Sequence, residues 1–119
     1  MKTVLVIDDA GFDRTIISAI LTQSGYSVIG EAESGTEGLQ MARELKPELI
    51  TLDKMMPDMD GMEVLEILYK ENFPGKIVLV SGDDLIAVKE KALAMGALDF
   101  FKKPISKGDL KLRLDALFA

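Results

Sequence analysis

The stretch VLVIDD, from Val4 to Asp9, joins four uninterrupted apolar residues to two adjacent carboxylates. An apolar run without polar alternation is typical of a strand that is covered on both faces. Similar runs follow at residues 27–30, 49–52 and 77–80, with a weaker one at 97–101. The stretch therefore predicts the first strand of a buried sheet that ends on two negative charges.

Amphipathic stretches separate these runs and predict helices. Apolar side chains recur at helical spacing in four of them: Phe12, Ile16, Ile17, Ile20 and Leu21; Leu65, Leu68 and Tyr69; Leu85, Val88, Ala92 and Met95; and Leu110, Leu114 and Leu117. A weaker helix is predicted between the capping-box pair Ser34 and Glu37 and the stop at Pro47. Asp60 and Ser106 are candidate N-caps of the helices that follow the third and fifth strands.

Strict alternation of five strands with five helices predicts an α/β fold. Short crossovers of this kind make the sheet parallel, with helices on both faces. Five units are too few to close an eight-stranded barrel, so we expect a doubly wound, open (βα)5 sheet. Open parallel sheets bind ligands beyond the carboxyl ends of their strands, and that edge is where a functional site is expected.

Length and composition limit the function. The 119 residues predict one domain spanning 1–119. A net charge of −6 disfavours nucleic acid and membrane surfaces as ligands. There is no cysteine and no histidine, which excludes disulfides, thiolate chemistry and imidazole catalysis. No stretch has the length of a membrane span or a signal peptide, so we expect a soluble chain in the cytoplasm.

Chemically useful side chains follow four of the five apolar runs. They are Asp8 and Asp9 after the first, Asp53 after the third, Ser81 after the fourth and Lys103 shortly after the fifth. Three converging carboxylates repel one another unless a cation joins them. Because the available ligands are oxygens, with few carboxylates and room for water, Mg²⁺ is the expected ion. Metal, ammonium and hydroxyl beside one carboxylate suit the capture of a phosphoryl group.

Each of these features has a simpler interpretation when it is taken alone. Two acidic residues before a helix are often an N-cap, and Ser-Gly after a strand is often only a turn. A lysine before a proline carries little information. The functional interpretation depends on the conjunction, since every feature falls at the same predicted edge of the sheet in the required order.

The whole chain resembles the receiver domains of two-component response regulators, of the CheY-like type. The motifs that carry the resemblance are VLVIDD, LDKMMPDMDGMEVL, VLVSGDD and GALDFFKKPI. The resemblance implies a flavodoxin-like sheet with strand order 2-1-3-4-5. It also implies that the chain is not a conventional enzyme: it would catalyse only phosphotransfer to its own aspartate and the later loss of that group.

The resemblance also implies residue roles. Asp53 would be the phosphoacceptor, and the Mg²⁺ ligands would be Asp8, Asp9, Asp53 and the backbone carbonyl of Met55. Ser81 would be the switch hydroxyl, Lys103 would bind the phosphoryl group, and the Lys103–Pro104 peptide bond would be cis. Phe100 occupies the position of the aromatic switch.

Several positions depart from the common pattern of the family. Phe100 replaces the tyrosine of many chemotaxis members, and Gly82 replaces a usual alanine. Lys54 is unusual directly after the phosphoacceptor. Met55 and Asp83 occupy the variable positions that influence the lifetime of the phosphoryl group in this family.

The implied partners are a histidine kinase or phosphotransfer protein and a downstream target protein. We expect the target to bind the face made by the helix from Leu85 to Met95, the fifth strand and the last helix, and the protein to be a stand-alone monomer. A chemotaxis-type role is favoured, and a phosphorelay intermediate stays open. Three other functions remain as alternatives: a Mg²⁺-dependent phosphatase with an aspartyl nucleophile, a flavodoxin-like cofactor binder, and a degenerate receiver that acts only as an interaction module.

Overall fold

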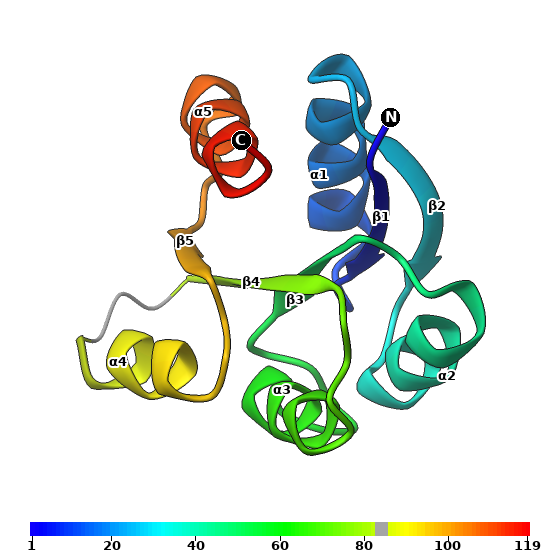
Figure 1. Ribbon diagram of the computed structural model, residues 1–119, viewed down its shortest axis with the longest axis vertical. Helices are drawn as coiled ribbons and strands as arrows, with labels where there is room; N and C mark the ends of the chain where they lie inside the picture. The colour runs from blue at the N-terminus through cyan, green and yellow to red at the C-terminus, as the bar shows by residue number, and fades with distance from the viewer. Residues whose placement is uncertain (83–85) are drawn as a thin grey trace.

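The computed structural model describes residues 1–82 and 86–119, and this part of the chain contains five parallel strands alternating with five helices (Figure 1). The strands are β1 (Thr3–Ile7), β2 (Ser27–Ala32), β3 (Leu49–Asp53), β4 (Lys76–Ser81) and β5 (Asp99–Lys102). The helices are α1 (Gly11–Gln23), α2 (Gly35–Leu45), α3 (Gly61–Lys70), α4 (Ile86–Ala94) and α5 (Lys107–Leu117). The strand order is β2-β1-β3-β4-β5. The predicted flavodoxin-like fold is confirmed.

Helices cover both faces of the sheet, with α1 and α5 on one side and α2, α3 and α4 on the other (Figure 1). Successive residues of β1 enter different cores: Val4 and Val6 pack with residues of α1 and α5, whereas Leu5 and Ile7 pack with residues of α2 and α3. This alternation follows from the period of two along a strand. It explains why the run is apolar throughout.

The weakest predicted strand, 97–101, is shorter at its start than expected. Its first residue belongs to the turn that ends α4, because the N–H of Ala97 donates to the carbonyl of Ala92 at 3.0 Å. Strand β5 begins at Asp99. The apolar character of Ala97 reflects burial beneath the helix end rather than membership of the strand.

Two apolar stripes are buried only in part. Along α1, Ile17 and Leu21 are buried, but Phe12 is 78% exposed and Ile16 is 38% exposed. These pairs form adjacent rows on the helix, and only the second row faces the core. On α3, Tyr69 is also exposed. The predicted start of the fourth helix at Leu85 lies outside the described residues.

The predicted helix N-caps are present, but Asp8 and Asp9 are not among them. Ser34, Asp60 and Ser106 each accept a backbone N–H at the start of their helices. By contrast, the N-cap of α1 is Ala10, which makes no side-chain capping bond. The interpretation of Asp8 and Asp9 as a simple N-cap is therefore wrong. Among the described residues, every helix is too short or too polar to cross a membrane.

Candidate phosphoryl and metal site

The carboxyl ends of β1 and β3 bring three aspartates together. Carboxylate oxygens of Asp8, Asp9 and Asp53 all lie within 4.8 Å of one another. Asp8 and Asp53 are buried, with 1% and 4% of their surface exposed, while Asp9 is exposed. The convergence of these side chains, which the sequence predicted from the topology of a parallel sheet, is confirmed.

Lys103 reaches the same site from the segment after β5. Its Nζ atom lies 3.1 Å from Asp8 Oδ2 and 3.3 Å from Asp53 Oδ1. The predicted cis peptide bond between Lys103 and Pro104 is present. A third carboxylate, Asp13, accepts a hydrogen bond from Nζ at 2.9 Å.

Asp13 was missed by the sequence analysis. It lies in the first turn of α1, where an acidic residue is ordinary because it complements the helix dipole. The available signal was positional: α1 starts three residues after Asp8, so its first turn must lie close to the carboxyl edge of the sheet. Asp13 does not belong to the group of three aspartates whose oxygens converge.

The proximity of these charges alters the protonation of Asp53 and Lys103. Burial and the charge of Asp8 raise the pKa of Asp53 to about 7, although Lys103 opposes the shift. Burial alone would lower the pKa of Lys103, but hydrogen bonds to Asp13 and Asp8 and the charge of Asp53 raise it above its ordinary value. The ammonium therefore stays charged while the aspartate is held close to titration at neutral pH.

The donor set fits a hard divalent cation. Asp8 Oδ1 accepts the N–H of Ala10 at 2.9 Å, which orients the carboxylate. Its other oxygen, Oδ2, is buried and lies 3.1 Å from the Nζ atom of Lys103. A cluster of carboxylates that offers only oxygen ligands is the ligand set that Mg²⁺ prefers. The described residues thus support a divalent metal site.

The loop after β3 is held close to the site by backbone contacts. The N–H of Gly61 donates to the carbonyl of Lys54 at 2.8 Å, and a Cβ atom on Gly61 would lie 2.3 Å from the backbone oxygen of Asp53. Only glycine allows helix α3 to start this close to the strand end. From the same loop, Asp58 caps α2 by accepting the N–H groups of Gly35 and Thr36, each at 2.9 Å.

Lys54 and Met55, the two residues directly after Asp53, have different surroundings. Lys54 pairs with the α3 N-cap, its Nζ atom lying 3.7 Å from Asp60 Oδ2. The side chain of Met55 is exposed. The predicted contribution of its backbone carbonyl to metal binding stays a prediction, and Asp83 lies outside the described residues.

Ser81 and Phe100 lie on adjacent strands near the site. Ser81 is the last residue of β4 and is fully buried. Phe100 is 6% exposed and packs in the core on the side of α4. The ring of Phe100 is therefore buried in this structure, and its role as the aromatic switch stays a prediction.

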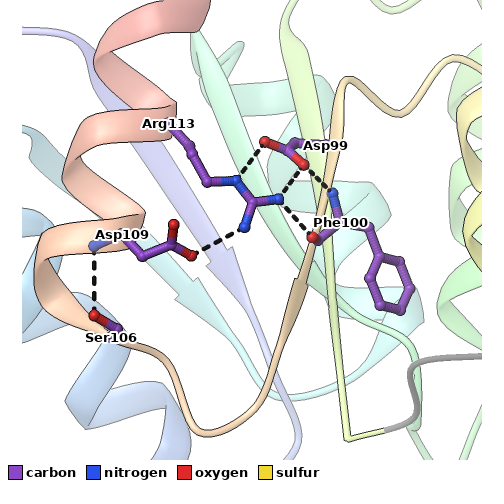
Figure 2. Close-up of polar contacts among 5 residues, drawn as sticks. All are labelled: Asp99, Phe100, Ser106, Asp109 and Arg113. Carbon is purple, nitrogen blue, oxygen red and sulfur yellow. Dashed lines mark hydrogen bonds and ion pairs between the residues drawn. The ribbon is translucent and has the colours of Figure 1, made fainter.

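Arg113 of α5 holds the backbone around Phe100 (Figure 2). Its guanidinium donates to the carbonyl of Phe100 at 2.8 Å and binds both carboxylate oxygens of Asp99. It also donates to Asp109 at 2.9 Å and stacks 4.1 Å from the centre of the Phe101 ring. The N–H of Phe100 donates to Asp99 Oδ1 at 2.8 Å. Side chains thus occupy both backbone groups of Phe100 on the last strand of the sheet.

Fold and site together define an α/β domain with three converging aspartates and a neighbouring lysine at the carboxyl edge of its sheet. The response regulator receiver domain family matches residues 4–115, and the chain belongs to this family. It is a CheY-like receiver domain, as the resemblance implied, and receivers of this kind are not conventional enzymes.

Individual relatives support this assignment. The chain is 39% identical over 103 residues to the chemotaxis protein CheY of Thermotoga maritima, covering 87% of this chain and 86% of that one. It is 41% identical over 107 residues to a protein-glutamate methylesterase/protein-glutamine glutaminase of Halobacterium salinarum, of which it covers 30%. The structure is also similar to a chain in the Borrelia burgdorferi complex of CheX, CheY, BeF3 and Mg²⁺, with a TM-score of 0.95 and 25% sequence identity. This match covers 99% of this chain and 90% of that one.

Proposed function

We propose that this chain is a stand-alone receiver that accepts a phosphoryl group on Asp53 and signals through a protein surface, in a chemotaxis-type role. The observation that carries the proposal is the placement of buried Asp53 beside Asp8, Asp9 and Lys103 at one edge of the sheet. The similarity to chemotaxis proteins over most of their length supports the chemotaxis-type role.

The phosphodonor is a phosphohistidine of a histidine kinase or phosphotransfer protein. A carboxylate oxygen of Asp53 attacks the phosphorus atom, an O–P bond forms, and the N–P bond breaks with its electron pair returning to the imidazole nitrogen. In hydrolysis, water attacks phosphorus, the O–P bond to Asp53 breaks, and inorganic phosphate leaves with the carboxylate restored. Lys103 stabilises the phosphoryl oxygens in both steps because its ammonium lies 3.3 Å from Asp53 Oδ1.

Asp8, Asp9, Asp53 and the backbone carbonyl of Met55 would hold the metal ion. Bound there, Mg²⁺ would supply positive charge for the phosphoryl oxygens and for the three carboxylates. Asp8 is already oriented by the N–H of Ala10. The chain therefore supplies a preorganised ligand rather than one that must be ordered on binding.

An exposed apolar row on α1 is suited to receive the phosphodonor protein. Phe12 and Ile16 are exposed. Ile16 also lines a groove of about 180 Å³ together with Lys103, Pro104 and Ile105. A phosphohistidine must reach Asp53 from a surface next to the site, and this row adjoins the lysine of the site. We assign the row formed by Phe12 and Ile16, with this groove, as the donor surface.

The output surface is the face formed by α4, β5 and α5. Ser81 ends β4 immediately before the segment that leads into α4, and Lys103 follows β5 directly. A phosphoryl group held by both residues acts on this face from two ends, with Phe100 between them. Phosphorylation biases an equilibrium between two packings of this region, and the target protein binds one of them.

The proposal is tested with a small phosphodonor such as acetyl phosphate. Intact-mass spectrometry should detect one added phosphoryl group in the presence of Mg²⁺ and none when Mg²⁺ is removed with EDTA. Asp53→Asn should abolish the addition, since an amide cannot form the acyl phosphate. Labelling that persists in this variant would place the acceptor elsewhere. A wild-type chain that binds partners but takes no label would instead be a degenerate receiver.

A further inference from the structure

The contact between Asp13 and Lys103 has no part in the function proposed so far. It joins the first turn of α1 to the segment after β5, across 90 positions of the sequence. Its N···O distance of 2.9 Å is the shortest of the three contacts that Lys103 makes with carboxylates of the described residues. An ammonium has three protons to donate, and within residues 1–82 and 86–119 three carboxylates lie within 3.3 Å of it.

The three carboxylates differ in what would happen to them when a metal ion binds. Asp8 and Asp53 belong to the converging group of aspartates, so a cation there would neutralise much of their charge. Asp13 lies outside that group and would keep its full charge for the ammonium. The ion pair between Asp13 and Lys103 is therefore the contact that persists when the metal ion is bound.

Asp13 also differs in its access to water. Its side chain is 38% exposed, whereas those of Asp8 and Asp53 are 1% and 4% exposed. A carboxylate at this degree of exposure regains hydration when its partner leaves, while a buried one does not. Asp13 can thus release Lys103 at little cost, and the release leaves no buried charge unpaired.

We propose that Asp13 is a positioning residue that tethers Lys103 and competes with the phosphoryl group for its ammonium. The inference rests on the proposed function, because it concerns how strongly the site holds a phosphoryl group on Asp53. The tether holds the lysine beside the site before phosphorylation and weakens its grip on the phosphoryl oxygens afterwards. The negative charge of Asp13 also repels the negatively charged phosphoryl group, and this repulsion further weakens the binding of that group. Asp13 thereby shortens the lifetime of the phosphorylated state.

Beryllofluoride, a mimic of the phosphoryl group, provides the test. In the presence of saturating Mg²⁺, its affinity is measured by isothermal titration calorimetry on the wild-type chain and on Asp13→Asn. We expect the variant to bind beryllofluoride about fivefold more tightly, the effect of removing a partly exposed ion pair. Asp13→Glu, which restores the charge, should return the affinity toward the wild-type value. Mg²⁺ affinity, measured without beryllofluoride, should change by less than about twofold, because Asp13 is not among the converging ligands.

A matched control is Glu33→Gln, which also removes one surface carboxylate near the start of α1. Glu33 pairs with Arg14 rather than with Lys103, so this variant should bind beryllofluoride like the wild type. Unchanged beryllofluoride affinity in Asp13→Asn, or an equal increase in affinity in both variants, would refute the proposed role of Asp13. A tenfold loss of Mg²⁺ affinity in Asp13→Asn would make Asp13 a metal ligand instead and also overturn it. Failure of the wild-type chain to bind beryllofluoride or to be phosphorylated on Asp53 would refute the proposed function itself.

Discussion

At the scale of single residues, the surroundings of Asp53 disfavour the negative charge of its carboxylate. Burial and the neighbouring Asp8 carboxylate raise the pKa of this group to about 7, against an ordinary value of 3.8. Between these two values the folded chain binds more protons at Asp53 than the unfolded chain does. The contribution of this group to stability is therefore intact at low pH and is lost as pH rises from about 4 to about 7.

Asp53→Asn should remove this pH dependence. In EDTA at pH 8, we expect the variant to be more stable than the wild type by roughly 1–3 kcal/mol in the free energy of unfolding, and the gap should narrow as the pH falls toward 4. Urea unfolding at several pH values measures both effects. A variant that is less stable at pH 8 would contradict the charge repulsion inferred at this site.

Ser81 and Lys103 should have separable effects. Ser81→Ala should still be labelled by acetyl phosphate but should signal poorly, because the hydroxyl acts in the conformational response. Lys103→Ala should weaken beryllofluoride binding about tenfold or more, since it removes a cation from the phosphoryl oxygens. Mass spectrometry and calorimetry distinguish the two outcomes. Equal and negligible effects would place neither residue at the site.

At the scale of elements, α1 presents two different rows. The row of Ile17 and Leu21 is buried, and the row of Phe12 and Ile16 is exposed beside the site. Phe12→Ala should slow phosphotransfer from a phosphorylated kinase or phosphotransfer protein by about tenfold, as expected for an exposed aromatic anchor. Labelling by acetyl phosphate should not change. The matched control is Ile86→Ala, which removes a similarly exposed apolar side chain from α4; equal slowing by both would argue against a donor surface on α1.

The α4, β5 and α5 face gives a second prediction at this scale. Adding Mg²⁺ and beryllofluoride should shift NMR signals from Asp53 through Ser81 to Phe100 and α5. Phe100→Leu keeps the core apolar and should weaken activation-dependent binding of the target more than it weakens labelling. Signal shifts confined to the residues around Asp53, together with target binding that Phe100→Leu leaves unchanged, would make Phe100 a static core residue.

At the scale of the whole molecule, metal binding should report on global stability. We expect Mg²⁺ to bind with a dissociation constant on the order of millimolar, as a few carboxylates with water do. At ten times that concentration, mass action should raise the free energy of unfolding by about 1.4 kcal/mol and Tm by about 5 °C. Asp9→Ala should abolish this increase without disturbing the core, because Asp9 is exposed. Thermal unfolding measures it, and a wild-type response in Asp9→Ala would remove Asp9 from the ligand set.

Much of the fold and of the site could be predicted from the sequence, for a physical reason. Apolar runs without alternation require a sheet covered on both faces, and parallel strands have all their carboxyl ends at one edge. The residues directly after those runs, Asp8, Asp9, Asp53 and Ser81, therefore had to converge, wherever the helices packed. The strand order itself was implied by the resemblance to receiver domains and then confirmed.

Other features were decided only by the tertiary structure. Periodicity places residues on one face of a helix, but the packing of the elements determines how much of that face is covered, so the burial of Ile17 and the exposure of Phe12 could not be separated in advance. The cap that Asp58 provides for α2 joins residues 22 and 23 positions apart. The bond between Asp13 and Lys103 spans 90 positions. Local sequence can place a residue such as Asp13 near the edge of the sheet, but it does not specify its partner, because such pairs form only when separate helices and strands have packed at a fixed distance from one another.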